Sequence, residues 1–382
     1  MNICFVITDS INLHSLYRDQ FRFLKSHSVS VTAIASPGKE HSWIEAQAVR
    51  SVPINISRQP HVLKDFISLI RIWWFFIFNR FDLIVVSTPK ASLIGSLAAR
   101  LAFQKRLVFM IRGRAYENMR GVKREFFRLM DKITCGLSDR VQSISKELAE
   151  SYVEEGICAS GKIIVLGLGS SNGVDLSKFD PDFHLERRHL VRRDLGVKDS
   201  SFVFMYCGRV RRDKGIDELV AAFQRFLSSP LGTNEAVLLI VGSYELFDPL
   251  KGETIKFLTE SRNVCFVEWA RHVEPYFSAA DVFVFPSHRE GFGNVALEAS
   301  AMSLPVIAFD VVGSREAVEA DRSGLLVEAF SVEGLFQAMV RLYESEELRR
   351  TLGSYGRRRV EHYFDSEVVW RRLLRFYNEV VG

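Results

Sequence analysis

Apolar runs of strand length alternate along this chain with longer segments whose apolar residues recur at helical spacing. The expected strands are residues 3–8, 29–35, 82–86, 106–111, 141–145 and 162–166 in the first half, and 202–207, 237–241, 264–267, 282–285 and 305–308 in the second. Helices are expected between them, among others at 216–227, 273–279, 294–301 and 332–343. Strands that alternate with helices form parallel sheets covered by helices, so the pattern predicts one α/β architecture twice.

Residues 166–182, LGLGSSNGVDLSKFDPD, concentrate Gly, Ser, Asn, Asp and Pro without a period, which is typical of a linker. We place a domain boundary there, near Gly173, with a first domain over residues 1–172 and a second over 173–360. A length of 382 residues suits two domains. Residues 361–382 predict a closing amphipathic helix that packs back towards the first domain.

Composition excludes several classes of protein. Apolar residues make up 47% and charged residues 25% of the chain, as in ordinary globular proteins. Five cysteines, an odd number with no C-x-x-C pair, fit neither a disulfide framework nor a zinc site. The start, MNICFVITDS, is expected to be a strand and not a signal peptide, and a reducing cytoplasm is the expected compartment.

Charge is distributed unevenly. Residues 1–175 carry 23 Lys and Arg against 15 Asp and Glu, whereas the remainder carries 27 against 31. A basic half attracts nucleic acid, anionic lipid or phosphorylated substrates. No RNA-binding signature or Cys/His finger accompanies the basic residues, so we expect no nucleic-acid partner.

The segment FISLIRIWWFFIFNRFDLIVV, residues 66–86, is rich in aromatic residues. Its charge-free run lies between Arg71 and Arg80 and is too short to span a bilayer. Two interpretations stay open: a core helix followed by a strand, or an interfacial helix whose flanking arginines contact anionic lipid. The basic balance of this half favours the interfacial helix.

Two motifs in the second half predict a site for an anion. In residues 286–310, PSHREGFGNVALEASAMSLPVIAFD, Glu290 and Glu298 flank a glycine-rich turn between a strand and a helix. Glycines at such a turn let backbone amides approach a phosphate, and Glu298 can accept hydrogen bonds from the two hydroxyls of a ribose. In residues 205–220, MYCGRVRRDKGIDELV, Arg209 and Lys214 follow a strand and are expected to clamp a pyrophosphate.

These motifs, with VVSTPKASLIGSLAARLA (85–102) and LGLGSSNGVDLSKF (166–179), resemble the retaining family 4 glycosyltransferases of GT-B fold, in particular the bacterial enzymes of capsule and O-antigen lipopolysaccharide synthesis. The resemblance covers essentially the whole chain. It implies two Rossmann-like domains that face a central cleft, with the acceptor bound by the first domain and the nucleotide-sugar donor by the second.

The resemblance also assigns roles. It implies that Arg209 and Lys214 hold the donor diphosphate, that Glu298 binds the ribose and that Glu290 contacts the donor sugar; we take Arg209, Lys214 and Glu290 as the catalytic residues. The donor site is completed by Gly208, Gly291, Phe292, Gly293 and Asn294. A leaving diphosphate needs cations as its charge develops. Family members retain the anomeric configuration through attack in which a donor phosphate oxygen takes the acceptor's proton, so we assign no protein base.

The chain departs from the family pattern at the segment VFMIRGRAYEN, where Arg112 stands in place of a histidine that contacts the donor sugar. Arg112 either contacts the sugar or a phosphate, or pairs with Glu117 and touches no substrate. The loop after the first strand lacks the usual glycine pair, and His14 and Arg18 are its candidate contacts.

We expect no metal and no cofactor besides the donor substrate. Asp180-Pro181-Asp182 matches the D-x-D string of metal-dependent transferases, but it lies in the linker and fits turn chemistry. No His and Cys cluster has metal spacing.

The sequence therefore predicts an enzyme that moves a hexose or N-acetylhexosamine from a UDP-linked donor to a polyprenyl-diphosphate-linked saccharide, as a peripheral protein on the inner face of the bacterial cytoplasmic membrane. Two alternatives stay open: a GT-B synthase or phosphorylase with a soluble acceptor, and a non-catalytic nucleotide-sugar-binding module.

Overall fold

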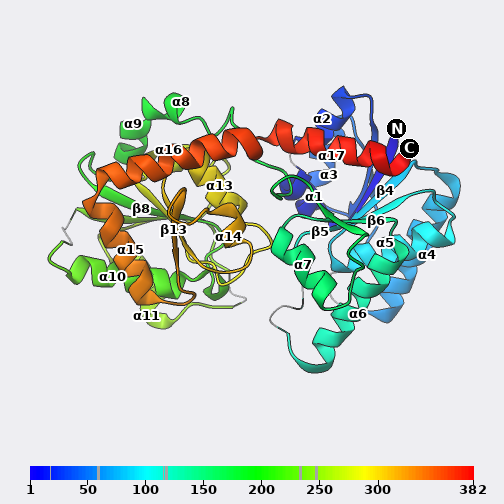
Figure 1. The fold of residues 1–382 in the computed structure, drawn as a ribbon, viewed down its shortest axis with the longest axis horizontal. Helices are drawn as coiled ribbons and strands as arrows, with labels where there is room; N and C mark the ends of the chain where they lie inside the picture. The colour runs from blue at the N-terminus through cyan, green and yellow to red at the C-terminus, as the bar shows by residue number, and fades with distance from the viewer. Residues whose placement is uncertain (18, 58–60, 115, 117–118, 232–234, 246–247) are drawn as a thin grey trace. The chain divides into compact units, whose positions relative to one another are not determined.

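The chain forms two compact units in the computed structural model (Figure 1), which describes residues 1–382 except 18, 58–60, 115, 117–118, 232–234 and 246–247. Unit 1 comprises Met1–Gly173 and Ser366–Gly382, and unit 2 comprises Val174–Asp365. The chain thus leaves unit 1 after Gly173 and returns to it for the last helix.

Unit 1 is built on a parallel sheet of seven strands in the order β3-β2-β1-β4-β5-β6-β7. The strands are β1 (Asn2–Asp9), β2 (Ser30–Ser36), β3 (Arg50–Pro53), β4 (Leu83–Ser87), β5 (Leu107–Ile111), β6 (Arg140–Ser143) and β7 (Ile163–Val165). The helices are α1 (Ser10–Tyr17), α2 (Gln20–Ser26), α3 (Glu40–Glu45), α4 (Val62–Phe78), α5 (Pro89–Leu101), α6 (Gly121–Leu137), α7 (Lys146–Glu154) and α17 (Ser366–Val381).

The central strands of unit 1 are apolar throughout because helices cover both faces of the sheet. On one face, α17 packs with α1 and α2 over strand residues such as Phe5, and Trp370 of α17 donates from Nε1 to Asn172 Oδ1 over 2.7 Å. The chain then crosses from β3 back to β4, so right-handed crossovers put α4, α5 and α6 on the other face (Figure 1).

Unit 2 repeats this plan with six parallel strands in the order β10-β9-β8-β11-β12-β13. The strands are β8 (Phe202–Cys207), β9 (Ala236–Val241), β10 (Val264–Val267), β11 (Val282–Phe285), β12 (Val306–Phe309) and β13 (Gly324–Val327). The helices are α8 (Pro181–Leu185), α9 (Arg188–Asp194), α10 (Ile216–Ser228), α11 (Gly252–Glu260), α12 (Glu274–Ala279), α13 (Asn294–Ala301), α14 (Ser314–Ala317), α15 (Val332–Glu344) and α16 (Glu346–Tyr363), with a 3-10 turn at Arg212–Lys214.

The predicted double α/β architecture is confirmed, and two details are corrected. The sequence pattern missed the four-residue edge strands β3 and β13. The closing helix predicted over 361–382 is present as α17, Ser366–Val381, in unit 1, but it begins later than predicted because α16 continues to Tyr363. The break lies where the carbonyl of buried Phe364 accepts a hydrogen bond from the amide of Val174 over 2.7 Å.

The aromatic segment forms α4 and leads into β4, as both interpretations of it require. Its inner face is buried at Ile72 and Phe76, whereas large apolar side chains on its outer face are exposed. No helix in the described part of the chain is both long and apolar enough to cross a bilayer.

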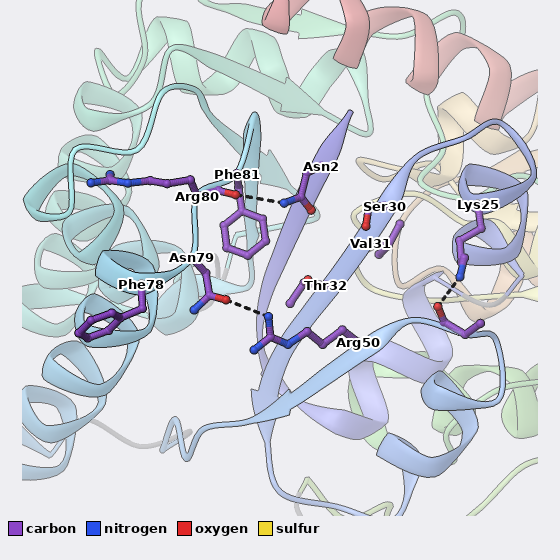
Figure 2. A pocket seen from close by; sticks show the side chains of 11 residues that line it. Asn2, Lys25, Ser30, Val31, Thr32, Arg50, Phe78, Asn79, Arg80 and Phe81 are labelled. Atoms are coloured by element: carbon purple, nitrogen blue, oxygen red, sulfur yellow. Dashed lines mark hydrogen bonds between the residues drawn. The ribbon is translucent and has the colours of Figure 1, made fainter.

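A hollow of about 400 Å³ lies at the amino-terminal edge of the unit 1 sheet, beside the last turn of α4 (Figure 2). It is lined by Asn2, Lys25, Ser30, Val31, Thr32, Ala48, Arg50, Phe78, Asn79, Arg80 and Phe81. This edge is opposite to the one where the strands of unit 1 deliver the predicted site residues.

Candidate functional site

The two predicted motifs of unit 2 follow neighbouring parallel strands, β8 and β11, although they are far apart in sequence. The chain moves from β8 to β9 on one side and reaches β11 on the other, so strand order reverses between β8 and β11. Ligands of open α/β sheets bind outside the carboxyl ends of the strands at such a switch point.

Lys214 and Glu290, 76 residues apart, meet at this point. Lys214 Nζ lies 2.5 Å from Glu290 Oε1, and their side chains are only 13% and 20% exposed. Ser287 contacts both side chains. Its Oγ donates to Glu290 Oε1 over 2.8 Å and lies 3.4 Å from Lys214 Nζ. Sequence reasoning missed Ser287, because a lone serine after a strand carries no pattern.

Glycines hold the loops of this site close together. Gly215 has a left-handed φ of 70°, and a Cβ there would lie 1.9 Å from the carbonyl oxygen of Pro286. Gly242, after β9, has a φ of 152°, and its Cβ would lie 1.8 Å from the carbonyl oxygen of Gly208. Any side chain at either position would therefore push the loops apart.

Arg209, the second predicted cation, lies at the surface of the same loop. Its side chain is 54% exposed, and Nη1 stands 3.6 Å from Glu245 Oε2. Arg211 lies 3.4 Å from the same carboxylate and 2.5 Å from Asp213. Arg209 is thus free to turn, while Arg211 is held in place by two carboxylates.

In the predicted phosphate turn, Gly291 to Asn294, two backbone amides already donate hydrogen bonds within the protein. The amide of Gly293 donates to the carbonyl of Gly313 over 3.3 Å, and the amide of Asn294 donates to Phe292 over 2.8 Å. The Phe292 ring is buried against Phe364, 5.8 Å between centroids. Helix α13 then begins at Asn294, and its amino end remains directed at the turn.

Glu298 lies in the second turn of α13 and is only 6% exposed. Its carboxylate is close to the end of β8: burial, then Glu298, then Glu274 raise the pKa of the Cys207 thiol to about 12. The structure therefore brings Glu298 to the same strand end as the loop that carries Gly208.

In unit 1, Arg112 follows β5, and its guanidinium carbon lies 4.9 Å from the centroid of the Tyr17 ring. Within the described part of the chain, its three side-chain nitrogens are buried without a hydrogen-bond partner, as are the hydroxyls of Tyr17 and Tyr377. Burial and then Tyr17 raise the pKa of Tyr377, while Arg112 opposes the rise. A buried cation without an anion is costly, and none of the described residues supplies one to Arg112, so this position suits an anionic ligand.

Other predicted contacts of unit 1 are less defined. His14 belongs to α1, with a side chain outside the described part of the structure, and Arg18 and Glu117 lie outside the described residues. The sequence did not single out Thr88, which follows β4 with an unusual φ of 71° and whose Oγ1 lies 2.6 Å from Thr8 Oγ1. These threonines mark the switch point of unit 1, between β1 and β4.

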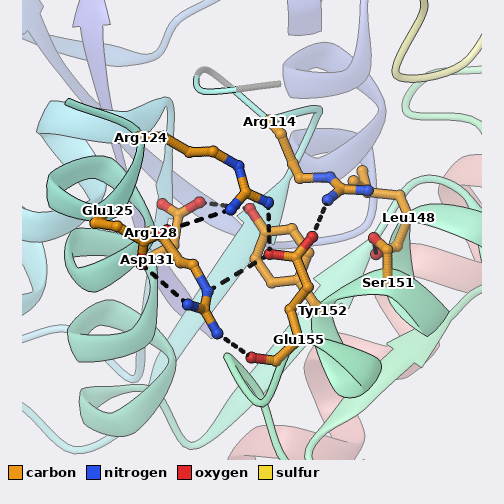
Figure 3. A network of polar contacts seen from close by, with 9 residues as sticks. All are labelled: Arg114, Arg124, Glu125, Arg128, Asp131, Leu148, Ser151, Tyr152 and Glu155. Carbon is orange, nitrogen blue, oxygen red and sulfur yellow. Dashed lines mark hydrogen bonds and ion pairs between the residues drawn. The ribbon is translucent and has the colours of Figure 1, made fainter. Parts of the chain in front are cut away.

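The loop after Arg112 is anchored by a polar network between α6 and α7 (Figure 3). Glu155 accepts from Arg114 over 2.5 Å and is 3.3 Å from Arg124 and 3.5 Å from Arg128. Beside them, Tyr152 donates to buried Asp131 over 2.5 Å. The network fixes the backbone two residues after Arg112 and so helps position the guanidinium.

The structure describes no group of three or more His, Cys, Asp or Glu side chains, within the residues it covers, that could hold a metal ion. Asp180, from the D-x-D string, caps α8: its Oδ1 accepts from the amides of Asp182 over 3.0 Å and Phe183 over 3.4 Å. This is the turn chemistry predicted for it.

Comparison with known proteins shows related sequences. Residues 188–359 match the family model described as glycosyl transferases group 1, and residues 18–178 match that of glycosyltransferase family 4. A Staphylococcus aureus protein named capsular polysaccharide biosynthesis glycosyltransferase CapM is 32% identical over 363 residues, 95% of this chain and 93% of that protein. The Escherichia coli UDP-Gal:alpha-D-GlcNAc-diphosphoundecaprenol alpha-1,3-galactosyltransferase is 28% identical, covering 77% of this chain and 74% of that protein.

Solved structures share the fold. A glycosyltransferase from Rickettsia africae superposes with a TM-score of 0.81 at 17% identity, covering 100% of this chain and 98% of that one. The HepE protein of Anabaena in complex with UDP and glucose gives a TM-score of 0.78 at 18% identity, covering 99% of both chains.

The polar network makes a prediction about pH. Burial raises the pKa of Asp131 to about 6, although Tyr152 and Arg114 oppose the rise. Because this folded-state value lies above the ordinary one, the native protein takes up the proton first as the pH falls. The carboxylate therefore destabilises the fold above pH 6, by up to about 3 kcal/mol, and progressively less towards pH 4. Asp131→Asn should raise the melting temperature more at pH 7.5 than at pH 4.5.

The control for this measurement is Asp194→Asn, at a carboxyl that is 73% exposed and should show no such difference between the two pH values. An equal effect of Asp131→Asn at both pH values would contradict a raised pKa.

Proposed function

The chain belongs to the family 4 glycosyltransferases, is a transferase enzyme and has the GT-B fold; on that premise we propose that it builds a bacterial surface polysaccharide, a capsule or an O-antigen. It transfers a hexose or N-acetylhexosamine, with retention of configuration, from a UDP-linked donor to a polyprenyl-diphosphate-linked saccharide. The observation that carries this proposal is the cluster of Lys214, Glu290 and Ser287 at the switch point of unit 2. The CapM and galactosyltransferase relatives support the substrate class by their names.

Donor binding, in this proposal, uses the ion pair as a preformed site. The Lys214 ammonium takes the diphosphate, which frees Glu290 to accept from hydroxyls of the donor sugar, and Ser287 holds the carboxylate in place. Arg209 turns from Glu245 towards the phosphates. Glu298, at the end of β8, accepts from the ribose hydroxyls, and the turn from Gly291 with the amino end of α13 supplies the remaining polar contacts.

The reaction breaks the bond between the sugar and the diphosphate, and negative charge grows on the leaving oxygen. Two cations, Lys214 and Arg209, stabilise that charge, so we propose a transfer without a divalent metal or other cofactor. The acceptor hydroxyl attacks from the same face, and its proton passes to a phosphate oxygen of the donor. No protein base is needed for this step.

Arg112 of unit 1 is proposed to contact a phosphate, of the donor or of the acceptor diphosphate. Its buried guanidinium nitrogens are unpaired within the described part of the chain, and an arginine offers a phosphate two parallel hydrogen bonds. His14 and Arg18, which follow β1 in the sequence, are proposed as further contacts to the acceptor or the sugar.

Peripheral association with the inner face of the cytoplasmic membrane is proposed from the outer faces of α4 and α6. On α4 the exposed apolar side chains follow one stripe: Leu63, Phe66, Ile67, Ile70, Trp74, Ile77 and Phe78. On α6 a second stripe contains Val122, Phe126, Leu129 and Ile133. Lys64 and Arg71 border the first stripe at helical spacing, as expected for an interfacial helix on anionic lipid.

Lys214→Ala should lower sugar transfer at least a hundredfold, because the leaving diphosphate loses its buried cation. The measurement is transfer of a radiolabelled sugar to a membrane-extract acceptor, with the melting temperature as a check on the fold. Lys198→Ala is the control, since this lysine forms an exposed ion pair with Glu235 elsewhere in unit 2. Transfer by Lys214→Ala at the rate of the control would remove the diphosphate role.

Glu298→Gln should weaken UDP binding about tenfold by calorimetry, because an amide replaces the carboxylate that accepts from the ribose. UDP is a suitable probe because it lacks the unidentified sugar. In the wild type, 2′-deoxy-UDP should bind more weakly than UDP, and this difference should shrink in Glu298→Gln. An undiminished difference would assign the ribose contact to another residue.

Trp74→Ser should reduce sedimentation with phosphatidylglycerol-containing vesicles several-fold, since a large aromatic side chain leaves the bilayer boundary. Trp269→Ser is the matched control: Trp269 of unit 2 is 71% exposed, against 57% for Trp74. A wild-type protein that does not sediment with these vesicles would contradict the membrane proposal and favour a soluble acceptor.

A further inference from the structure

The hollow at the amino-terminal edge of unit 1 (Figure 2) is lined by cations whose partners among the described residues are neutral. Arg50 donates from Nη1 to Asn79 Oδ1 over 2.8 Å and lies 5.2 Å from the centroid of the Phe75 ring. Lys25 donates to the carbonyl oxygen of Ala48 over 2.5 Å. The described residues that line the hollow include no Asp or Glu, so Arg50 and Lys25 have no carboxylate there to neutralise them.

Arg80 closes the wall of the hollow with its backbone. Its carbonyl accepts from Asn2 Nδ2 over 3.0 Å, and its side chain points away from the hollow, where Nη1 donates to the carbonyls of Ala102 and Phe103 (Figure 2). The site therefore presents one guanidinium and one ammonium, together with the hydroxyl-bearing side chains of Ser30 and Thr32. This chemistry suits a phosphate group.

The hollow continues into the exposed apolar stripe of α4. Phe78 belongs to both: it lines the hollow, it is 68% exposed, and its ring packs edge-on against Trp74, 5.0 Å between centroids. A molecule with a phosphate in the hollow could therefore lay hydrocarbon along Phe78 and Trp74. A phospholipid has this combination of groups, and a free nucleotide or sugar phosphate does not.

Because of the position of α4, a lipid bound in the hollow could orient the protein on the membrane. The helix follows β3 and precedes β4, so it runs from the carboxyl edge of the parallel sheet to the amino-terminal edge. Its 17 residues span roughly 25 Å. A lipid held at the far end would fix the tilt of α4 on the bilayer, while the other end stays beside the sheet edge that carries Thr8 and Arg112.

We propose that this hollow, around Arg50 and Lys25, binds the phosphate headgroup of an anionic phospholipid. The proposal rests on the membrane association proposed above and adds a specific headgroup site to it. It also separates the lipid that orients the protein from the lipid-linked acceptor, because the two would bind at opposite edges of one sheet.

The test is vesicle sedimentation of the double variant Lys25→Gln/Arg50→Gln. With vesicles that contain phosphatidylglycerol, we expect apparent affinity to fall at least tenfold, and with pure phosphatidylcholine we expect no difference from the wild type. UDP binding should be unchanged. The matched control is Arg140→Gln/Lys162→Gln, which removes the same charge at the β6 and β7 side of unit 1; these residues also donate to carbonyl oxygens, of Asp139 and Gly136. It should stay within twofold of the wild type.

Three results would overturn the proposal, and each has a distinct meaning. If the double variant sediments like the wild type while Trp74→Ser is impaired, the membrane association is supported and the headgroup site is contradicted. Equal losses in the double variant and the control would indicate non-specific attraction. The third result is that inorganic phosphate stabilises the wild type but not the double variant against heat, while both bind vesicles equally. This would assign the hollow to a soluble phosphate. A wild type that binds no vesicle would instead contradict the membrane association itself.

Discussion

The close approach of two backbone segments at the switch point of unit 2 is the constraint on which its candidate site depends. Gly215 lies so near the carbonyl of Pro286 that no Cβ fits between them, and this contact ties the loop after β8 to the loop after β11. Lys214 and Ser287 are the adjacent residues, and they meet around Glu290. An ion pair that is largely withdrawn from water is stable only with good geometry and further hydrogen bonds, which the glycine contact and Ser287 provide here.

The candidate site of unit 1 depends on a different feature. It contains a buried guanidinium that, within the described part of the chain, has a tyrosine ring for a neighbour and no hydrogen-bond partner. Such an arrangement opposes folding, and the surrounding structure must hold it. The network of Glu155 with Arg114, Arg124 and Arg128 anchors the following loop, while α17 packs against α2 behind it. Stability and the candidate site are therefore linked: the polar network anchors the loop that follows a guanidinium for which the described residues offer no hydrogen-bond partner.

The outer faces of α4 and α6 are also unfavourable in water. Exposed aromatic and aliphatic side chains along a helix do not stabilise the fold in water, and they favour association with other molecules. The inner face of α4 is ordinary, with Ile72 and Phe76 fully buried. A helix with one face in the core and an equally apolar face outside is suited to two different surroundings. The proposed bilayer contact and headgroup site give the outer face and the basic hollow beside it one common explanation.

The sequence by itself determined the α/β architecture and the central strands, and it placed the candidate residues Lys214 and Glu290 on the loops that follow β8 and β11. Strands such as 202–207 and 282–285 were predicted to the residue because apolar runs bounded by polar turns fix them. The edge strand Arg50–Pro53 was missed because it contains one valine between polar residues and a proline, whereas Gly324–Val327 was missed although it contains an apolar run. The break near Phe364 was missed because a carbonyl bonded to Val174 carries no sequence signal. Only the tertiary structure paired Lys214 with Glu290, added Ser287, placed the Arg112 guanidinium where no described residue hydrogen-bonds to it, and opened the hollow at Arg50. These features depend on which strands lie side by side, and local sequence pattern contains no information about contacts between residues distant in the chain.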